Sequence, residues 1–156
     1  MKGKGEVIMK LRERLPDFPS TSAWLNGSID KDYLIGQKPI LVFIWSVSCQ
    51  SCEGTVKWVE KLKQKYENRF QIVGVHMPRL RTDTDRRAIK EKAARLGMTY
   101  PILLDHDTSY SKLLGTQTVP NFYLFDKKGL FRHRQSGEVG LRLLEQKLVT
   151  IINEMT

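Results

Sequence analysis

Two cysteines, Cys49 and Cys52, stand three positions apart and are the only cysteines in the 156-residue chain. A disulfide between residues this close would stabilise the fold little, so the pair suits reversible thiol chemistry better than a structural role. The pair follows the apolar run Ile40–Trp45 and opens a segment with helical spacing. A thiol at the start of a helix meets unpaired backbone N–H groups and the positive end of the helix dipole, which favour the thiolate. Cys49 is therefore predicted to be a nucleophile.

The elements that must position this pair alternate between strands and helices. The run Ile40–Trp45 is rich in β-branched and aromatic residues, which predicts a buried central strand. Apolar residues recur at helical spacing from about 51 to 66, and residues 70–77 form the next apolar run, closed by Pro78. A strand, helix and strand in this order imply a right-handed crossover and parallel pairing of the two strands.

The flanking segments extend this pattern. Asn26-Gly27 is a strong tight-turn signal, so an N-terminal hairpin is expected before the main sheet. Residues 79–95 hold seven basic residues against three acids, with apolar positions at helical spacing, which predicts one amphipathic helix with a basic outer face. A short strand at 100–104 and a short helix at 109–114 are expected to follow.

The last third of the chain predicts a hairpin and a closing helix. Pro120 leads directly into the apolar residues 121–125, and a turn at 126–129 leads into a strand at 130–135. Apolar residues then line one face of a C-terminal helix: Leu141, Leu144, Leu148 and Ile151. We expect one α/β domain over residues 1–156, with residues 1–8 as a disordered lead-in.

Charge and hydropathy limit the classes of partner. The chain carries 26 Lys and Arg against 17 Asp and Glu, a net charge of +9. No nucleic-acid-binding motif accompanies this charge, so a basic solvated surface is expected and no nucleic-acid partner. No stretch has the apolar core of a signal peptide or the length of a membrane span, so we expect no membrane partner and a cytoplasmic location. An extracytoplasmic location is the alternative, if a leader has been removed.

The order of these elements, the motif from Trp45 to Cys52 and the Val119-Pro120 pair resemble the thioredoxin fold in its TlpA/ResA-type elaboration. The resemblance implies a mixed central sheet flanked by helices, with an N-terminal hairpin extension and an inserted strand–helix unit. It also implies a monomeric thiol-disulfide oxidoreductase that exchanges disulfides with protein substrates and is served by an upstream thiol reductant. Its redox group would be the Cys49–Cys52 disulfide, with no other cofactor and no metal.

The same resemblance implies roles for individual residues. Cys49 matches the exposed attacking cysteine and Cys52 the buried resolving one, so a mixed disulfide on Cys49 would be released by Cys52. Pro120 matches a cis-proline that faces the pair and, with Val119, holds an extended substrate peptide. The remaining candidates for substrate contact are the neighbours of the cysteines: Trp45, Ser48, Gln50 and Ser51.

Two acids of the family are missing. Phe43 stands where thioredoxins have a buried aspartate, and Met77 where ResA-type proteins have a glutamate. The proton of Cys52 would then pass to water, His76 or Glu53, and the sequence does not choose among them. Apart from that role, His76 is expected at the surface or in a loop.

Two other functions, a thiol-dependent peroxidase and a copper carrier, are considered for the same residues. Peroxiredoxins share this fold and place a hydroxyl where Ser46 lies, but they have a proline where this chain has Val42. A copper carrier would need a CxxxC motif, and here the spacing is one residue short. Gln50 and Ser51 between the cysteines are uncharged and supply no cation to the thiolate, which favours a disulfide reductant over an oxidant.

Overall fold

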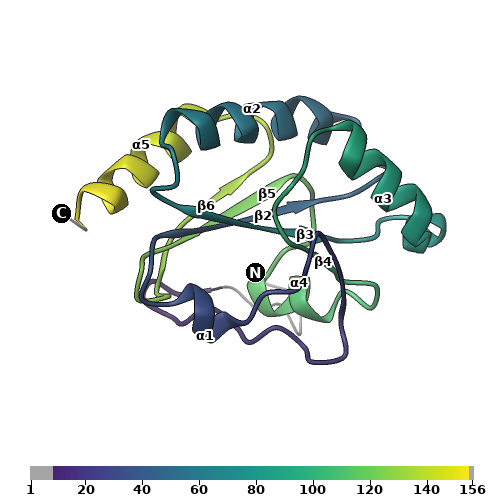
Figure 1. Ribbon diagram of the computed structural model, residues 1–156, viewed down its shortest axis with the longest axis horizontal. Coiled ribbons are helices and arrows are strands. Elements are labelled where there is room, and N and C mark those ends of the chain that lie inside the picture. The colour runs from purple at the N-terminus through teal and green to yellow at the C-terminus, as the bar shows by residue number, and fades with distance from the viewer. Residues whose placement is uncertain (1–8, 155–156) are drawn as a thin grey trace, which may run out of the picture.

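The computed structural model describes residues 9–154, so the predicted lead-in at 1–8 lies outside the described residues. Six strands form one sheet in the order β1-β4-β3-β2-β5-β6 (Figure 1). The strands are β1 Ala23–Leu25, β2 Ile40–Trp45, β3 Gln71–His76, β4 Ile102–Leu104, β5 Asn121–Phe125 and β6 Phe131–Ser136. The helices are α1 Lys31–Leu34, α2 Ser51–Lys65, the 3₁₀ turn η1 Arg81–Thr84, α3 Arg86–Arg95, α4 Ser109–Leu114 and α5 Leu141–Asn153.

Helices cover both faces of the sheet. In Figure 1, α2, α3 and α5 lie on one side and α1 and α4 on the other. The side chains of β2 alternate between the two layers, as expected of a strand buried on both faces. Leu41, Phe43 and Trp45 pack in the α2 and α5 layer, with Cys49 and Cys52. Ile40, Val42 and Ile44 pack in the layer of α1 and α4.

The central strand β2 lies between β3, its predicted parallel neighbour, and β5, a neighbour that was not predicted from the sequence. It runs parallel to β3, where Trp45 stands opposite His76, and antiparallel to β5, where Ile44 stands opposite Asn121. The end of β2, the end of β3 and the start of β5 therefore meet at one edge of the sheet. The chain leaves β2 at this edge and enters the cysteine motif. The sheet therefore sets the position at which the cysteine motif begins. This topology is that of the thioredoxin-like fold which the resemblance implies, with a mixed six-stranded sheet flanked by helices.

The predicted N-terminal hairpin is wrong. Asn26 and Gly27 do form a turn with positive φ angles of 60° and 90°, but no strand follows it before α1. The strand before the turn, β1, pairs antiparallel with β4 instead. The Asn26 side chain also donates to the carbonyl oxygens of Met98 at 2.9 Å and Tyr100 at 3.0 Å. The turn is local, but its partners are more than 70 residues away in sequence.

The single helix predicted at 79–95 is two elements, η1 and α3. Asp85 separates them in an extended conformation, and its carboxylate accepts hydrogen bonds from the backbone N–H groups of Arg87 at 3.0 Å and Ala88 at 3.4 Å. An aspartate in this position is a favourable helix N-cap, so α3 begins after it. The basic outer face is confirmed on exposed side chains: Arg81, Arg86, Arg87, Lys90 and Arg95.

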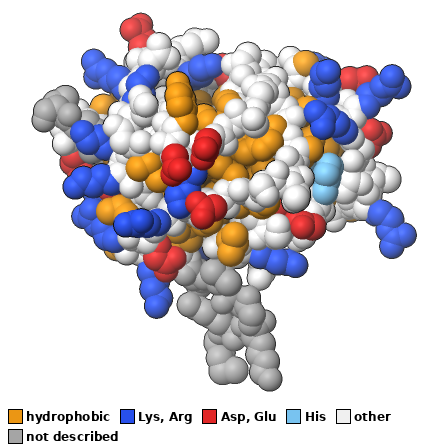
Figure 2. All heavy atoms as spheres, turned by 60° about the horizontal axis from the view of Figure 1, so that its bottom comes forward, with side chains coloured by type: hydrophobic (Ala, Val, Ile, Leu, Met, Phe, Trp, Pro, Cys, Tyr) orange, Lys and Arg blue, Asp and Glu red, His pale blue; other side chains and the backbone are white. Residues whose placement is uncertain are grey.

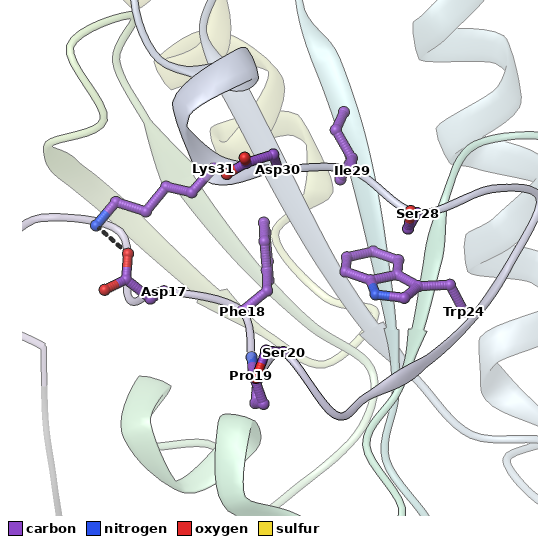
Figure 3. A pocket seen from close by; sticks show the side chains of 9 residues that line it. All are labelled: Asp17, Phe18, Pro19, Ser20, Trp24, Ser28, Ile29, Asp30 and Lys31. Carbon is purple, nitrogen blue, oxygen red and sulfur yellow. Dashed lines mark ion pairs between the residues drawn. The ribbon is translucent and has the colours of Figure 1, made fainter.

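Residues 9–18 pack on the layer of α1 and α4 through Met9, Leu15 and Phe18. Figure 2 shows the molecule from this side, where hydrophobic side chains gather near the middle. The Phe18 ring lies 5.2 Å from the rings of both Trp24 and Tyr110. Lys31 and Asp17 form an ion pair at 2.9 Å beside a hollow of about 410 Å³ (Figure 3). This hollow lies in the layer that does not contain the cysteines.

No helix within residues 9–154 is long and apolar enough to span a membrane.

Candidate active site

The two cysteines form a disulfide at the start of α2. Their Cα atoms are 5.4 Å apart, Cys49 lies just before the helix, and Cys52 lies in its first turn. Cys49 is 2% exposed and Cys52 1% exposed, so the expected exposure of Cys49 is not found in the oxidised protein. The reason is that both residues pack in the apolar cluster under α2, with Val47 and Val119 against it. The Oγ of Ser51 lies 3.4 Å from Sγ of Cys49, so a neutral hydroxyl adjoins that sulfur.

The Val119–Pro120 peptide bond is cis, as predicted. It stands directly before β5, whose first residue, Asn121, pairs with Ile44 of β2. The proline therefore lies at the sheet edge from which the chain enters the cysteine motif. Val119 is half-buried and packs against the cluster that contains both cysteines, whereas Pro120 is buried. The fold thus brings Val119 to the cysteine cluster although about 70 residues separate them in sequence.

The short segment Ser46-Val47-Ser48, here called the pre-cysteine loop, joins β2 to Cys49. The N–H of Val47 donates to Nε2 of His76 at 3.0 Å, and the carbonyl oxygen of Val47 accepts from Nζ of Lys92 at 2.7 Å. Both backbone polar groups of Val47 are thus satisfied by side chains, one from β3 and one from α3. A hollow of about 450 Å³ adjoins this loop, and its lining residues are Val47, Ala88, Glu91, Lys92 and Arg95.

Asp83 holds the two serines of the loop. Its Oδ2 accepts hydrogen bonds from the hydroxyl of Ser46 at 3.1 Å and of Ser48 at 2.7 Å. The same oxygen accepts from the backbone N–H groups of Arg79 and Leu80, both at 2.9 Å. Burial alone would raise the pKa of Asp83, but these four hydrogen bonds lower it below its usual value. Asp83 is therefore a buried carboxylate that is charged at neutral pH.

His76 is not the surface residue that we expected. It is 0% exposed, and burial lowers its pKa to about 4, so the ring is neutral at physiological pH. Because Nε2 accepts the hydrogen bond from Val47, the ring proton is on Nδ1, which has no hydrogen-bond partner among residues 9–154. Neither nitrogen offers a free lone pair to a thiol. This arrangement argues against His76 as the proton acceptor of Cys52, because protonation of Nε2 would break the bond to the loop.

The second candidate for proton transfer, Glu53, lies in the first turn of α2 and pairs with cations from α3. Its Oε1 lies 3.3 Å from Nζ of Lys92 and 4.0 Å from a guanidinium nitrogen of Arg95. The carboxylate is half-exposed. It follows Cys52 directly in sequence, so it stays a candidate, together with water.

Residues 12–148 of the chain match the Redoxin family. The chain belongs to the redoxin family. It is 39% identical over 146 residues to the thiol-disulfide oxidoreductase YkuV of Bacillus subtilis (strain 168), covering 94% of this chain and 99% of YkuV. Protein DipZ of Mycobacterium tuberculosis (strain CDC 1551 / Oshkosh) is 29% identical over 144 residues, which cover 89% of this chain but only 21% of DipZ.

Two solved structures show the same fold as this redoxin. The solution structure of a thioredoxin-like protein in the oxidised form has a TM-score of 0.85 and 39% identity, covering 94% of this chain and 99% of that one. A thiol-disulfide isomerase from Corynebacterium glutamicum has a TM-score of 0.72 at 20% identity, covering 88% and 96%. With the Cys49–Cys52 pair at the start of α2, the redoxin is a thiol-disulfide oxidoreductase. The family implies thiols of proteins as its substrates.

The structure changes the set of candidates for substrate contact in the redoxin. Trp45 is fully buried, and its ring packs edge-on against His76 with centroids 5.1 Å apart, so it supports the site from inside and is not a contact surface. Gln50 and Ser51 are exposed and Ser48 is half-buried, so these three stay candidates.

Two further residues at the site were missed in the sequence. Asp83 and Lys92 lie in the segment 79–95 and were interpreted only as part of a charged helix surface. A signal was present for Asp83, because it follows β3 closely and the carboxyl ends of parallel strands meet at one sheet edge. Lys92 gave no such signal, since its contact with Val47 depends on how α3 crosses the sheet. The two positions of the missing family acids are apolar: Phe43 stacks on Phe122 at 5.1 Å, and Met77 is buried.

Proposed function

We propose that this redoxin works as a disulfide reductant for protein substrates. The observation that carries this direction is the chemistry between the cysteines: Gln50 and Ser51 are uncharged, and the neutral hydroxyl of Ser51 lies 3.4 Å from Sγ of Cys49. Strong oxidants of this fold owe their high potential to stabilisation of the thiolate, and these two side chains bring no cation for that purpose.

The reaction runs in two exchange steps. The thiolate of Cys49 attacks one sulfur of a substrate disulfide, forms a mixed disulfide and releases the other substrate sulfur as a thiolate. The thiolate of Cys52 then attacks the sulfur of Cys49, which frees the second substrate thiol and leaves the Cys49–Cys52 disulfide. Two electrons have moved to the substrate, so an upstream thiol reductant must restore the dithiol before the next cycle. The hollow beside Val47 adjoins the loop that leads to Cys49 and offers room for a substrate side chain.

Equilibration of the purified protein in glutathione buffers tests the direction. We expect a potential near that of thioredoxin, about −270 mV, whereas a value near about −120 mV would place the protein among the oxidants. A Cys52→Ser variant should accumulate the mixed disulfide, and mass spectrometry of the trapped complex would identify the substrate. A Cys49→Ser variant is the matched control and should trap none.

We propose a cytoplasmic, monomeric protein as the setting for this reaction. A cytoplasmic dithiol is held reduced by its surroundings, which fits a reductant. Cell fractionation tests the location, with an extracytoplasmic signal supporting the alternative, and light scattering after size-exclusion chromatography tests the oligomeric state. The peroxidase alternative gains no support at Ser46, because its hydroxyl donates to Asp83.

A further inference from the structure

The pre-cysteine loop determines where the sulfur of Cys49 lies. Three residues separate β2 from Cys49, and the backbone N–H of Cys49 donates to the carbonyl oxygen of Ser46 at 3.1 Å. A shift of the loop would therefore move the nucleophile directly. The contacts that fix the loop come largely from the segment between β3 and β4, which contains η1 and α3 and is here called the inserted unit.

We propose that Asp83 and Lys92 are positioning residues by which the inserted unit holds the pre-cysteine loop and sets the reactivity of Cys49. Asp83 binds the hydroxyls of Ser46 and Ser48, the two side chains that flank Val47. Lys92 binds the carbonyl oxygen of Val47 itself and also pairs with Glu53 of α2. The loop is thus fixed on both sides by groups of opposite charge.

Helix capping explains only part of the hydrogen bonding of Asp83. Its carboxylate accepts from the backbone N–H of Leu80, the N-cap of η1, but the hydroxyls of Ser46 and Ser48 lie outside that turn. The N-terminus of α3 is already capped by Asp85, which lies two residues further on. A carboxylate that is 2% exposed carries a large desolvation cost unless several donors compensate it. Here two of the four donors belong to the inserted unit and two to the loop, so the carboxylate joins the two segments.

The two residues should shift the pKa of Cys49 in opposite directions. A negative charge near a thiol disfavours the thiolate, and a positive charge favours it. Ser48 directly precedes Cys49, and while its hydroxyl donates to Asp83 it cannot donate to the thiolate. Within the described part of the chain, the other ionisable groups around the loop include Glu53 on α2, Glu91 and Arg95 on α3 and the neutral His76 on β3.

The test measures the rate of iodoacetamide alkylation of Cys49 against pH in the reduced protein. Asp83→Asn keeps the shape of the side chain and removes its charge, so the midpoint should fall by about half a pH unit or more. Lys92→Gln removes the positive charge and should raise the midpoint. A general loosening of the loop would move the midpoints of both variants in the same direction. Opposite shifts therefore show that the charges of the two held residues act on Cys49.

The matched control is Asp105→Asn. Asp105 is also a buried aspartate, 3% exposed, and accepts three hydrogen bonds, all from residues of α4: Tyr110 N–H, Ser111 N–H and the Ser111 hydroxyl. It should destabilise the fold without moving the midpoint of Cys49.

Unchanged midpoints in both Asp83→Asn and Lys92→Gln would overturn the proposal, as would an equal shift in Asp105→Asn. If Asp83→Asn does not fold, Lys92→Gln decides the matter, because Glu53, the carboxylate that Lys92 pairs with, is half-exposed and can be solvated by water. The midpoint is a property of the reduced protein alone. The glutathione equilibrium measures the direction of the redox reaction separately. The positioning proposal, which rests on the proposed function, can therefore fail while the proposed direction holds, and the reverse.

Discussion

The backbone N–H of Val47 donates to Nε2 of His76 over 3.0 Å, which joins the pre-cysteine loop to the end of β3. This bond requires the neutral imidazole, and burial lowers the pKa of His76 to about 4. In the unfolded chain the ring takes up a proton near pH 6.5. Between these values the unfolded state binds more protons than the folded state, so stability falls as the pH falls.

We expect the free energy of unfolding in urea to be about 2 kcal/mol lower at pH 5 than at pH 7.5 because of this one residue. The matched variant is His76→Gln, whose amide oxygen can accept from Val47 but does not titrate. Between pH 7.5 and pH 5, the free energy of unfolding of this variant should fall by about 2 kcal/mol less than that of the wild type. An equal loss in the wild type and in the variant would show that His76 does not carry the effect.

In the reduced protein, Cys49 should be alkylated before Cys52. Cys49 is followed by the exposed Gln50 and Ser51, whereas Cys52 lies inside the first turn of α2. The helix dipole also favours the thiolate of Cys49. Peptide mapping by mass spectrometry after a brief treatment with less than one equivalent of iodoacetamide measures the ratio of the two products. Preferential labelling of Cys52 would reverse the roles of the two thiols.

Gly129→Ala should destabilise the protein more than Gly137→Ala. Both glycines have a positive φ, 79° and 76°, so both substitutions introduce backbone strain of about 1 kcal/mol. A Cβ at Gly129 would also lie 2.8 Å from two carbon atoms of Ile35, whereas a Cβ at Gly137 meets nothing within 4 Å. The clash should add roughly 1–2 kcal/mol to the loss at Gly129, measured by urea unfolding. Ile35→Ala should relieve that excess, and equal losses in the two single variants would contradict the steric argument.

The parts of the fold that were predictable from the sequence are those set by local pattern. The apolar run Ile40–Trp45 could only be a strand buried on both faces, and the helical spacing after Cys49 placed the thiols at a helix start. The apolar residues after Pro120 predicted a strand there, and the structure has β5 directly after the cis Val119–Pro120 bond. These signals are contained in a few neighbouring residues each.

The parts that were missed depend on contacts between distant segments. Asn26-Gly27 formed its turn, but the partner of β1 was decided by β4 far along the chain. His76 was interpreted as a surface residue because a histidine carries no sign of its own burial. Asp83 belonged to a strongly charged stretch, and only its four hydrogen bonds distinguish it from the solvated acids around it.

The two edge strands of the sheet, β1 and β6, present few free backbone groups for pairing with a strand of another chain. At one border β1 is only three residues long. At the other border the start of β6 is already occupied, because Phe131 exchanges backbone hydrogen bonds with Arg12 at 2.9 Å and Glu13 at 2.7 Å. The rest of β6 carries Arg132 and Arg134, and an irregularity interrupts its pairing with β5. Short, charged and irregular borders resist strand addition, so concentrated solutions of the folded protein should not assemble into cross-β aggregates.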